Sequence, residues 1–228
     1  MPIEVIALGL DGFRGGWVVV RIDGAHRAVY FVSHVADILA TDFNCAAIDI
    51  PIGMTDNGVR ECDLLARQFI RPHSARVFTG ARRWLWENFG DSDNANREAH
   101  KRGQSRVSRQ LWHLGPKIME VDAFVRTNRS FDIREAHPEL VFQRLNDGKP
   151  LASKKSEQGA SRRKTLLRRD GFSDLDLWLT QRRIGTGAKI DDVLDACACA
   201  IAARDRANCV PKENAPSDAF GLTMQIWF

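Results

Sequence analysis

The stretch VIALGLDGFRGGWVVVRIDGAHRAVYFV, residues 5–32, decides the fold of this chain. It holds three runs of apolar and β-branched residues, and such runs favour β-strands. The runs are residues 5–10, 17–22 and 28–32. The links between them are short and contain glycine, and Asp23-Gly24 is a typical hairpin turn. Because short links join antiparallel neighbours, the stretch predicts a three-stranded antiparallel meander.

A fourth strand is expected after a short helical pattern. Residues 33–41 have helical spacing behind a capping Ser33, and the apolar run 45–50 ends at Pro51. A strand that returns after a helical crossover is normally parallel to its neighbour. The sequence therefore predicts a mixed sheet, in which a parallel strand joins the meander.

The remainder of the chain is mainly helical in pattern. Helical spacing is found in residues 64–69, 108–126 and 189–206. The polar residues 88–106 suggest a mobile loop, 131–136 a short strand, and 222–228 a terminal strand. We expect one domain over residues 1–228, with a helical, basic insertion at 57–130.

Composition narrows the class of protein. The chain has 228 residues, of which 44% are hydrophobic and 27% charged, as in ordinary globular proteins. We find no signal peptide and no apolar run long enough to cross a bilayer, so the expected location is cytoplasmic, without a membrane partner. Five cysteines, an odd number, fit reduced thiols better than a disulfide framework.

Charge is unevenly distributed along the chain. The net charge is +4, but residues 60–130 and 151–190 each carry a balance of +6, while the other segments are acidic. An acidic centre bordered by basic segments is expected where a metal-dependent site meets a polyanion. Solvated helix faces would explain the same basic segments.

Aspartates interrupt the most apolar segments of the chain. Asp11 and Asp49 follow two strands that we expect to be parallel neighbours, so both should lie at one edge of the sheet. Asp192 and Asp195 are three residues apart on a helix and share one face. A buried carboxylate costs several kcal/mol unless it is paired or binds a metal. Together, these four residues predict a site for Mg²⁺ or Mn²⁺, and hence metal-assisted hydrolysis.

Simpler explanations exist for some of these acids. Asp11 precedes Gly12 and could serve a turn, and Asp192 suits the first turn of a helix. Asp49 and Asp195 are less easily explained, because apolar residues flank both.

A second polar cluster follows the strand at 131–136. Glu135 is a candidate catalytic residue, either as a further ligand or as a base that orients water. His137 could assist proton transfer or only cap the following helix. Glu139 comes directly after Pro138, so a first-turn acid at a helix start is its simplest interpretation, and an accessory role at the site, like that of His137, is the alternative.

Basic residues are the candidates for binding nucleic acid. We expect phosphate contacts from Arg14, Lys154, Lys155, Arg162 and Arg163. Three tryptophans in the insertion could stack bases, although such residues more often belong to a core. They are Trp84, Trp86 and Trp112.

Taken together, these motifs resemble the domain-of-unknown-function 429 family, described as predicted nucleases of the RNase H-like fold. The matching segments are Gly9-Leu-Asp-Gly12, Ile48-Asp-Ile-Pro-Ile-Gly53, Arg60-Glu-Cys-Asp63 with Ala66-Arg67, Glu135-Ala-His-Pro-Glu139, Ser153-Lys-Lys155 and Asp191-Asp-Val-Leu-Asp-Ala196. The resemblance implies an α/β fold, a mixed five-stranded sheet flanked by helices. It also implies metal ligands at Asp11 on the first strand, Asp49 on the fourth, and Asp192 with Asp195 on the last helix.

The expected function is that of a metal-dependent nuclease, a hydrolase that cleaves DNA or RNA with two cations. One alternative is a nucleotide phosphohydrolase or phosphotransferase of the actin-like ATPase class, since residues 10–16 could place a turn on a phosphate. Another is a non-catalytic nucleic-acid-binding module. Nucleotide binding would distinguish the first alternative, and retention of all four aspartates argues against the second.

Overall fold

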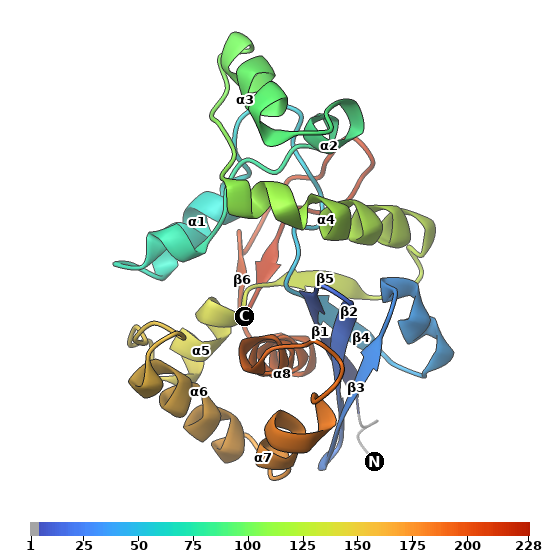
Figure 1. Ribbon diagram of the computed structural model, residues 1–228, viewed down its shortest axis with the longest axis vertical. Helices are drawn as coiled ribbons and strands as arrows, with labels where there is room; N and C mark the ends of the chain where they lie inside the picture. The colour runs from blue at the N-terminus through green and yellow to red at the C-terminus, as the bar shows by residue number, and fades with distance from the viewer. Residues whose placement is uncertain (1–4) are drawn as a thin grey trace. The chain divides into compact units, whose positions relative to one another are not determined.

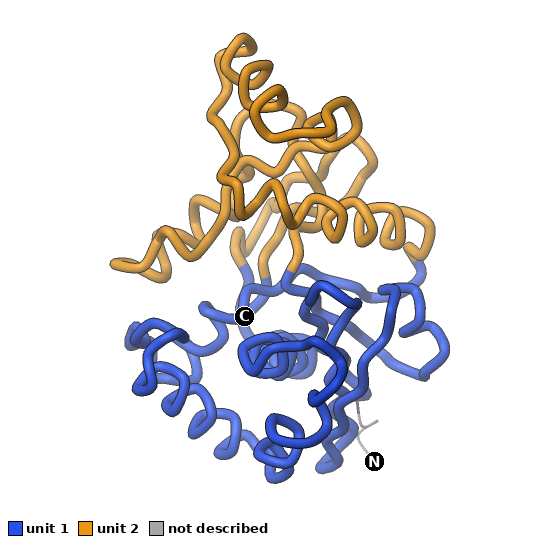
Figure 2. Tube along the Cα trace, in the orientation of Figure 1, with its two compact units in different colours: residues 1–49, 130–209, 227–228 blue, residues 50–129, 210–226 orange. Residues whose placement is uncertain are grey.

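The computed structural model describes residues 5–228 and divides the chain into two compact units, each of which is described by itself (Figure 2). Unit 1 consists of residues 1–49, 130–209 and 227–228, and unit 2 of residues 50–129 and 210–226. No helix among residues 5–228 combines the length and apolar character that a membrane crossing needs.

The predicted meander is present at the start of unit 1 (Figure 1). Its strands are β1 (Ile6–Phe13), β2 (Gly16–Asp23) and β3 (His26–Val32). Both neighbouring pairs are antiparallel, and the second hairpin closes at the pair Asp23 and His26, so its turn residues are Gly24 and Ala25. Gly24 has a φ of 54°, a left-handed conformation that glycine adopts without steric cost.

The sheet is mixed, which confirms the expected α/β class. Strand β4 (Cys45–Ile48) is parallel to β1, and β5 (Ile133–Ala136) is parallel to β4. The sheet has seven strands instead of five, in the order β3-β2-β1-β4-β5-β7-β6. The two additional strands are β6 (Cys209–Val210) and β7 (Ile226–Trp227). Strand β7 lies within the terminal strand expected at 222–228, whereas β6 is too short to produce an alternating pattern in the sequence.

Helix α8 (Ile190–Asp205) packs across β1, and every residue from Val193 to Ala203 is buried. Gly9 makes this close approach possible. A Cβ atom there would lie 2.0 Å from the backbone nitrogen of Ala200 and 2.2 Å from the carbonyl oxygen of Ala196. The glycine inside an apolar strand therefore marks the point where a helix backbone meets the sheet.

Shorter helices complete unit 1. The 3₁₀ helix η1 (Val35–Ala40) is capped by His34 instead of Ser33, because the Asp37 side chain accepts a hydrogen bond from the His34 amide. The others are α5 (Pro138–Leu145), α6 (Glu157–Arg169), α7 (Leu175–Leu177) and the π-helical turn η3 (Trp178–Arg182).

Unit 2 is built mainly from helices, of which the sequence indicated those at 64–69 and 108–126 by their spacing. The helices of unit 2 are α1 (Glu61–Phe69), η2 (Ser74–Arg76), α2 (Arg83–Asn88), α3 (Ser92–Lys101) and α4 (Arg109–Thr127). The expected mobile loop at 88–106 contains α3. The Asp91 side chain caps this helix by accepting hydrogen bonds from the amides of Asp93 and Asn94. The helix is so polar that its apolar face is not visible in the sequence.

The tryptophans of unit 2 belong to its packing. Trp84 is buried, and the rings of Trp86 and Trp112 stack with centroids 6.2 Å apart. The Trp86 indole also donates a hydrogen bond to the Trp112 carbonyl oxygen. These contacts favour the core interpretation over base stacking.

Candidate functional site

Strand register brings Asp11 and Asp49 together within unit 1. Leu10 of β1 pairs with Ile48 of β4, and the Asp49 amide donates to the Leu10 carbonyl oxygen at 3.1 Å. Residues two apart on a strand share a face, so Asp11 lies on the same face as Gly9, which meets α8. By the same alternation Asp49 lies on that face. Both carboxylates are therefore under the helix that carries the other two acids.

Helix α8 contributes Asp192 and Asp195 from its first turns. Asp192 accepts a hydrogen bond from the Lys189 amide at 2.7 Å, so it also helps to cap the helix. Asp195 is only 3% exposed. Its Oδ1 atom is buried and has no hydrogen-bond partner within residues 5–228. A buried carboxylate oxygen without a donor is the kind of atom that a cation would satisfy.

Lys154, one of the predicted phosphate contacts, lies among these acids. Its Nζ atom donates to Oδ2 of Asp195 at 2.6 Å and lies 3.6 Å from Oδ2 of Asp191. Burial alone would lower the pKa of Lys154, but the nearby carboxylates, chiefly Asp195, raise it above its usual value. The Lys154 ammonium group thus stays charged and neutralises part of the negative charge of these aspartates.

The four aspartates act on one another electrostatically. Burial and then the charge of Asp195 raise the pKa of Asp49 to about 7. Burial is also the main cause for Asp192, whose pKa rises to about 6, and for Asp11, whose pKa rises well above its usual value. Carboxyls that hold protons near neutral pH in this way are short of positive charge. We refer to Asp11, Asp49, Asp192 and Asp195 as the acidic cluster.

The donor chemistry of the acidic cluster fits a hard divalent cation. Mg²⁺ and Mn²⁺ prefer oxygen ligands, and the cluster offers four carboxylates, one with an unsatisfied buried oxygen. As the side chains stand, no group of three or more His, Cys, Asp or Glu residues in the described part of the chain has metal-binding geometry. Binding would therefore require the carboxylates to move toward one another and Lys154 to leave Asp195.

The structure gives different surroundings to the three residues of the second polar cluster, Glu135, His137 and Glu139. Glu139, in the first turn of α5, accepts two hydrogen bonds from Arg163, at 2.7 and 2.8 Å, and its charge raises the pKa of Asp49 after burial and Asp195. Glu135 is buried and pairs with Ile48, so alternation directs its side chain to the face opposite Asp49. His137 is the N-cap residue of α5.

The expected phosphate-binding residues also separate into two kinds. Arg163 is fully buried by its contacts with Glu139 and with the carbonyl oxygens of Ala152 and Gly159, so it has no exposed surface for a phosphate. Arg162 is half-buried and donates to the Asn146 side chain at 2.8 Å. Arg14 and Lys155 are exposed.

Two features of this site escaped the sequence interpretation. The position of Gly9 was visible as a glycine inside an apolar strand, but its packing role was not inferred. The contact of Lys154 with Asp195 crosses 41 residues, and no local pattern indicates it. Asp191, which was not among the predicted site residues, also lies beside Lys154.

Comparison with known proteins identifies one family. The sequence pattern of the family described as "Protein of unknown function (DUF429)" matches residues 9–215, a span that includes every residue of the acidic cluster. No curated protein and no solved structure matches the chain.

Proposed function

The chain belongs to the DUF429 family, and we propose that it is a metal-dependent nuclease of the RNase H-like kind, with the acidic cluster as its active site. The observation that carries the proposal is the meeting of four carboxylates from β1, β4 and α8 on one face of a mixed sheet. Phosphodiester hydrolysis with divalent cations needs such a set of oxygen ligands.

Each residue of the acidic cluster has a role in this proposal. Asp11, Asp49, Asp192 and Asp195 would hold Mg²⁺ or Mn²⁺. When bound, the cation supplies positive charge that polarises a phosphodiester oxygen. Binding of the cation would displace the proton that Asp49, with a pKa of about 7, retains near neutral pH. Lys154, once it leaves Asp195, can neutralise a phosphate oxygen beside the cluster.

The substrate in this proposal is DNA or RNA. The exposed Arg14 and Lys155 would contact its backbone, together with Arg162. Arg163 is assigned instead to the support of Glu139, whose carboxylate it holds with two hydrogen bonds. Glu139 in turn contributes negative charge near Asp49 and Asp195.

The proposal is tested by assaying cleavage of end-labelled single-stranded, double-stranded and branched DNA and of RNA, with Mg²⁺, Mn²⁺ or EDTA. We expect cleavage of at least one substrate that needs the cation and falls about 100-fold or more in Asp49→Asn. The control is Asp176→Asn, which removes an exposed carboxylate paired with Arg168 and should cleave normally. Cleavage that persists in Asp49→Asn, or no cleavage across the panel, contradicts the proposal.

One observation keeps a nucleotide phosphohydrolase as the second candidate. The β1–β2 hairpin turns at Arg14-Gly15, both exposed, three residues after Asp11. A turn beside a candidate metal ligand is a place where a nucleotide phosphate could bind. Saturable binding of ATP by calorimetry, lost in Arg14→Ala, would favour this candidate over the nuclease.

A further inference from the structure

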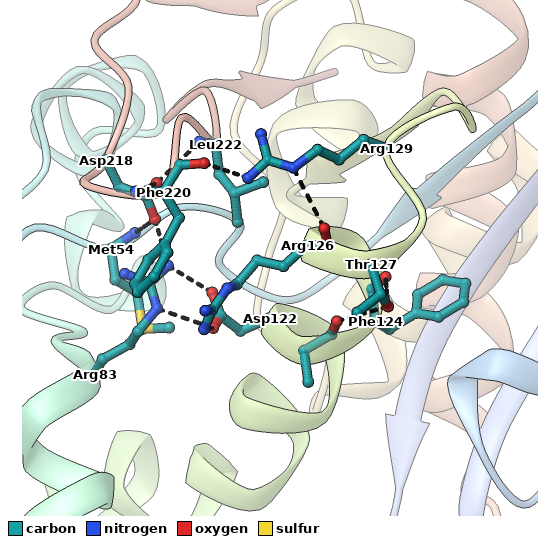
Figure 3. A network of polar contacts seen from close by, with 11 residues as sticks. Met54, Arg83, Asp122, Phe124, Arg126, Thr127, Arg129, Asp218, Phe220 and Leu222 are labelled. Carbon is teal, nitrogen blue, oxygen red and sulfur yellow. Dashed lines mark hydrogen bonds and ion pairs between the residues drawn. The ribbon is translucent and has the colours of Figure 1, made fainter.

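Two consecutive buried arginines in unit 2 differ sharply in their partners. Arg83 donates two hydrogen bonds to Asp122, at 2.9 and 2.6 Å, and also contacts Asp218 (Figure 3). Arg82 is completely buried, and its Nη2 atom donates to the backbone carbonyl oxygen of Ser105 at 2.7 Å. Its Nε and Nη1 atoms are buried without any acceptor in the described residues.

Arg82 therefore carries a buried charge without a counter-ion. Between residues 5 and 228, no carboxylate forms an ion pair with it. The Arg82 charge makes a cation–π contact with the ring of Trp84, whose centroid lies 5.5 Å from the guanidinium carbon. A contact of that kind is too weak to offset a buried cation with open donors. Burial lowers the pKa of Arg82, and no acid counteracts the shift.

The groups around Arg82 suit an anion. Ser105 lies in the coil between α3 and α4 and is exposed, as is its neighbour Arg106. A Cβ atom at Gly80 would stand 3.8 Å from both the Ser105 hydroxyl oxygen and Nη2 of Arg82, so these donors border the same position. Arg102, from the same coil, places its guanidinium carbon 4.3 Å from the Trp84 ring centroid.

We propose that Arg82 and Ser105 form a binding site for a phosphate group of a nucleic-acid strand, which enters when the coil at 102–106 moves aside. A guanidinium group with open Nε and Nη donors can bind two oxygens of a phosphate, and the Ser105 hydroxyl can donate to a third. The site gives unit 2 a role in holding the strand. It relies on the proposed function only for the source of the phosphate.

The adjacent arginines supply a matched pair of variants. Arg82→Met removes an unpaired buried charge, whereas Arg83→Met leaves Asp122 and Asp218 without their partner. Without added anion, we expect Arg82→Met to melt at or above the wild-type temperature and Arg83→Met to melt well below it. An Arg82→Met chain that does not fold, or that loses as much stability as Arg83→Met, overturns the proposal.

Ligand binding is measured in EDTA, so that the result does not depend on any nuclease activity. Inorganic phosphate should raise the melting temperature of the wild-type protein above that in chloride at equal ionic strength, and Arg82→Met should lose this rise. Ser105→Ala should reduce the rise without changing the basal melting temperature. An equal response to phosphate in the wild type and Arg82→Met would contradict the site.

The source of the phosphate is decided by a short single-stranded oligonucleotide, titrated by fluorescence anisotropy at several salt concentrations. We expect Arg82→Met to weaken binding about 10-fold and to reduce the salt dependence by about one phosphate contact. Unchanged oligonucleotide affinity, together with a lost response to inorganic phosphate, would assign the site to a free phosphate and overturn the nucleic-acid part of the proposal.

Discussion

Replacing Asp49 by Asn should stabilise unit 1 at neutral pH. The folded protein raises the pKa of Asp49 from its usual 3.8 to about 7, so between these values the folded state holds a proton that the unfolded state has released. The stabilisation that this proton provides is complete below pH 4 and is lost as pH rises toward 7. Asparagine does not titrate, and it therefore avoids the loss.

The size of the effect follows from the pKa. One pKa unit corresponds to about 1.4 kcal/mol, so the full shift amounts to on the order of 4 kcal/mol. Asp49 is half-buried and is influenced by Asp195, and solvent screening reduces this figure. We expect a gain of about 2 kcal/mol for Asp49→Asn at pH 7.5, with little difference from the wild type at pH 4.

Hydrogen exchange is the suitable assay, because a chain of two compact units need not unfold in one step. Exchange is followed by mass spectrometry in EDTA, on peptides from β1 and α8, from pH 5 to pH 8. After correction for the intrinsic exchange rate, protection of these peptides should fall less steeply with rising pH in Asp49→Asn than in the wild type, because Asp11 and Asp192 still titrate in the variant. The reasoning is refuted if the variant is less protected than the wild type at pH 7.5, or if both have the same pH dependence.

Three further results are expected. Mn²⁺ affinity, measured by calorimetry, should rise from pH 5.5 to 7.5, because protons on Asp192 and Asp49, with pKa values of about 6 and 7, compete with the cation; a pH-independent affinity would contradict this. Lys154→Met should bind Mn²⁺ about 10-fold more tightly, since it removes the ammonium group from Asp195, and weaker binding would show that Lys154 supports the ligand geometry instead. Gly9→Ala should destabilise the protein by about 3 kcal/mol or more, because its methyl group would overlap the α8 backbone, and an unchanged urea midpoint would exclude that packing.

The parts of the fold that the sequence predicts are those with local signals. Apolar runs and the turn at Asp23-Gly24 define the meander, and the apolar run after a crossover defines the parallel strand that bears Asp49. Helix α3 was missed because its stability begins with the cap at Asp91 and not with an apolar stripe. The edge strand β6 has only two residues and leaves no pattern, whereas β7 lies within the terminal strand expected at 222–228.

The features of the candidate site also fall into those with a local signal in the sequence and those without one. Acids that interrupt apolar segments are visible in a sequence, because burial of a charge is unusual without a partner. Long-range pairings are not visible: Lys154 with Asp195 and Arg163 with Glu139 arise only once α6, α8 and the intervening coil have packed. For that reason the basic residues were all assigned to phosphate, although one neutralises the acidic cluster and another supports Glu139.

The most direct test of the central claim is anomalous diffraction from crystals soaked in Mn²⁺ at neutral pH. The account predicts a strong Mn²⁺ peak bounded by Asp11, Asp49 and Asp195, with the Lys154 ammonium group displaced from Asp195. A map without Mn²⁺ at this position, in which Lys154 still contacts Asp195 while Mn²⁺ occupies other sites in the crystal, would contradict the assignment of the acidic cluster as a metal centre.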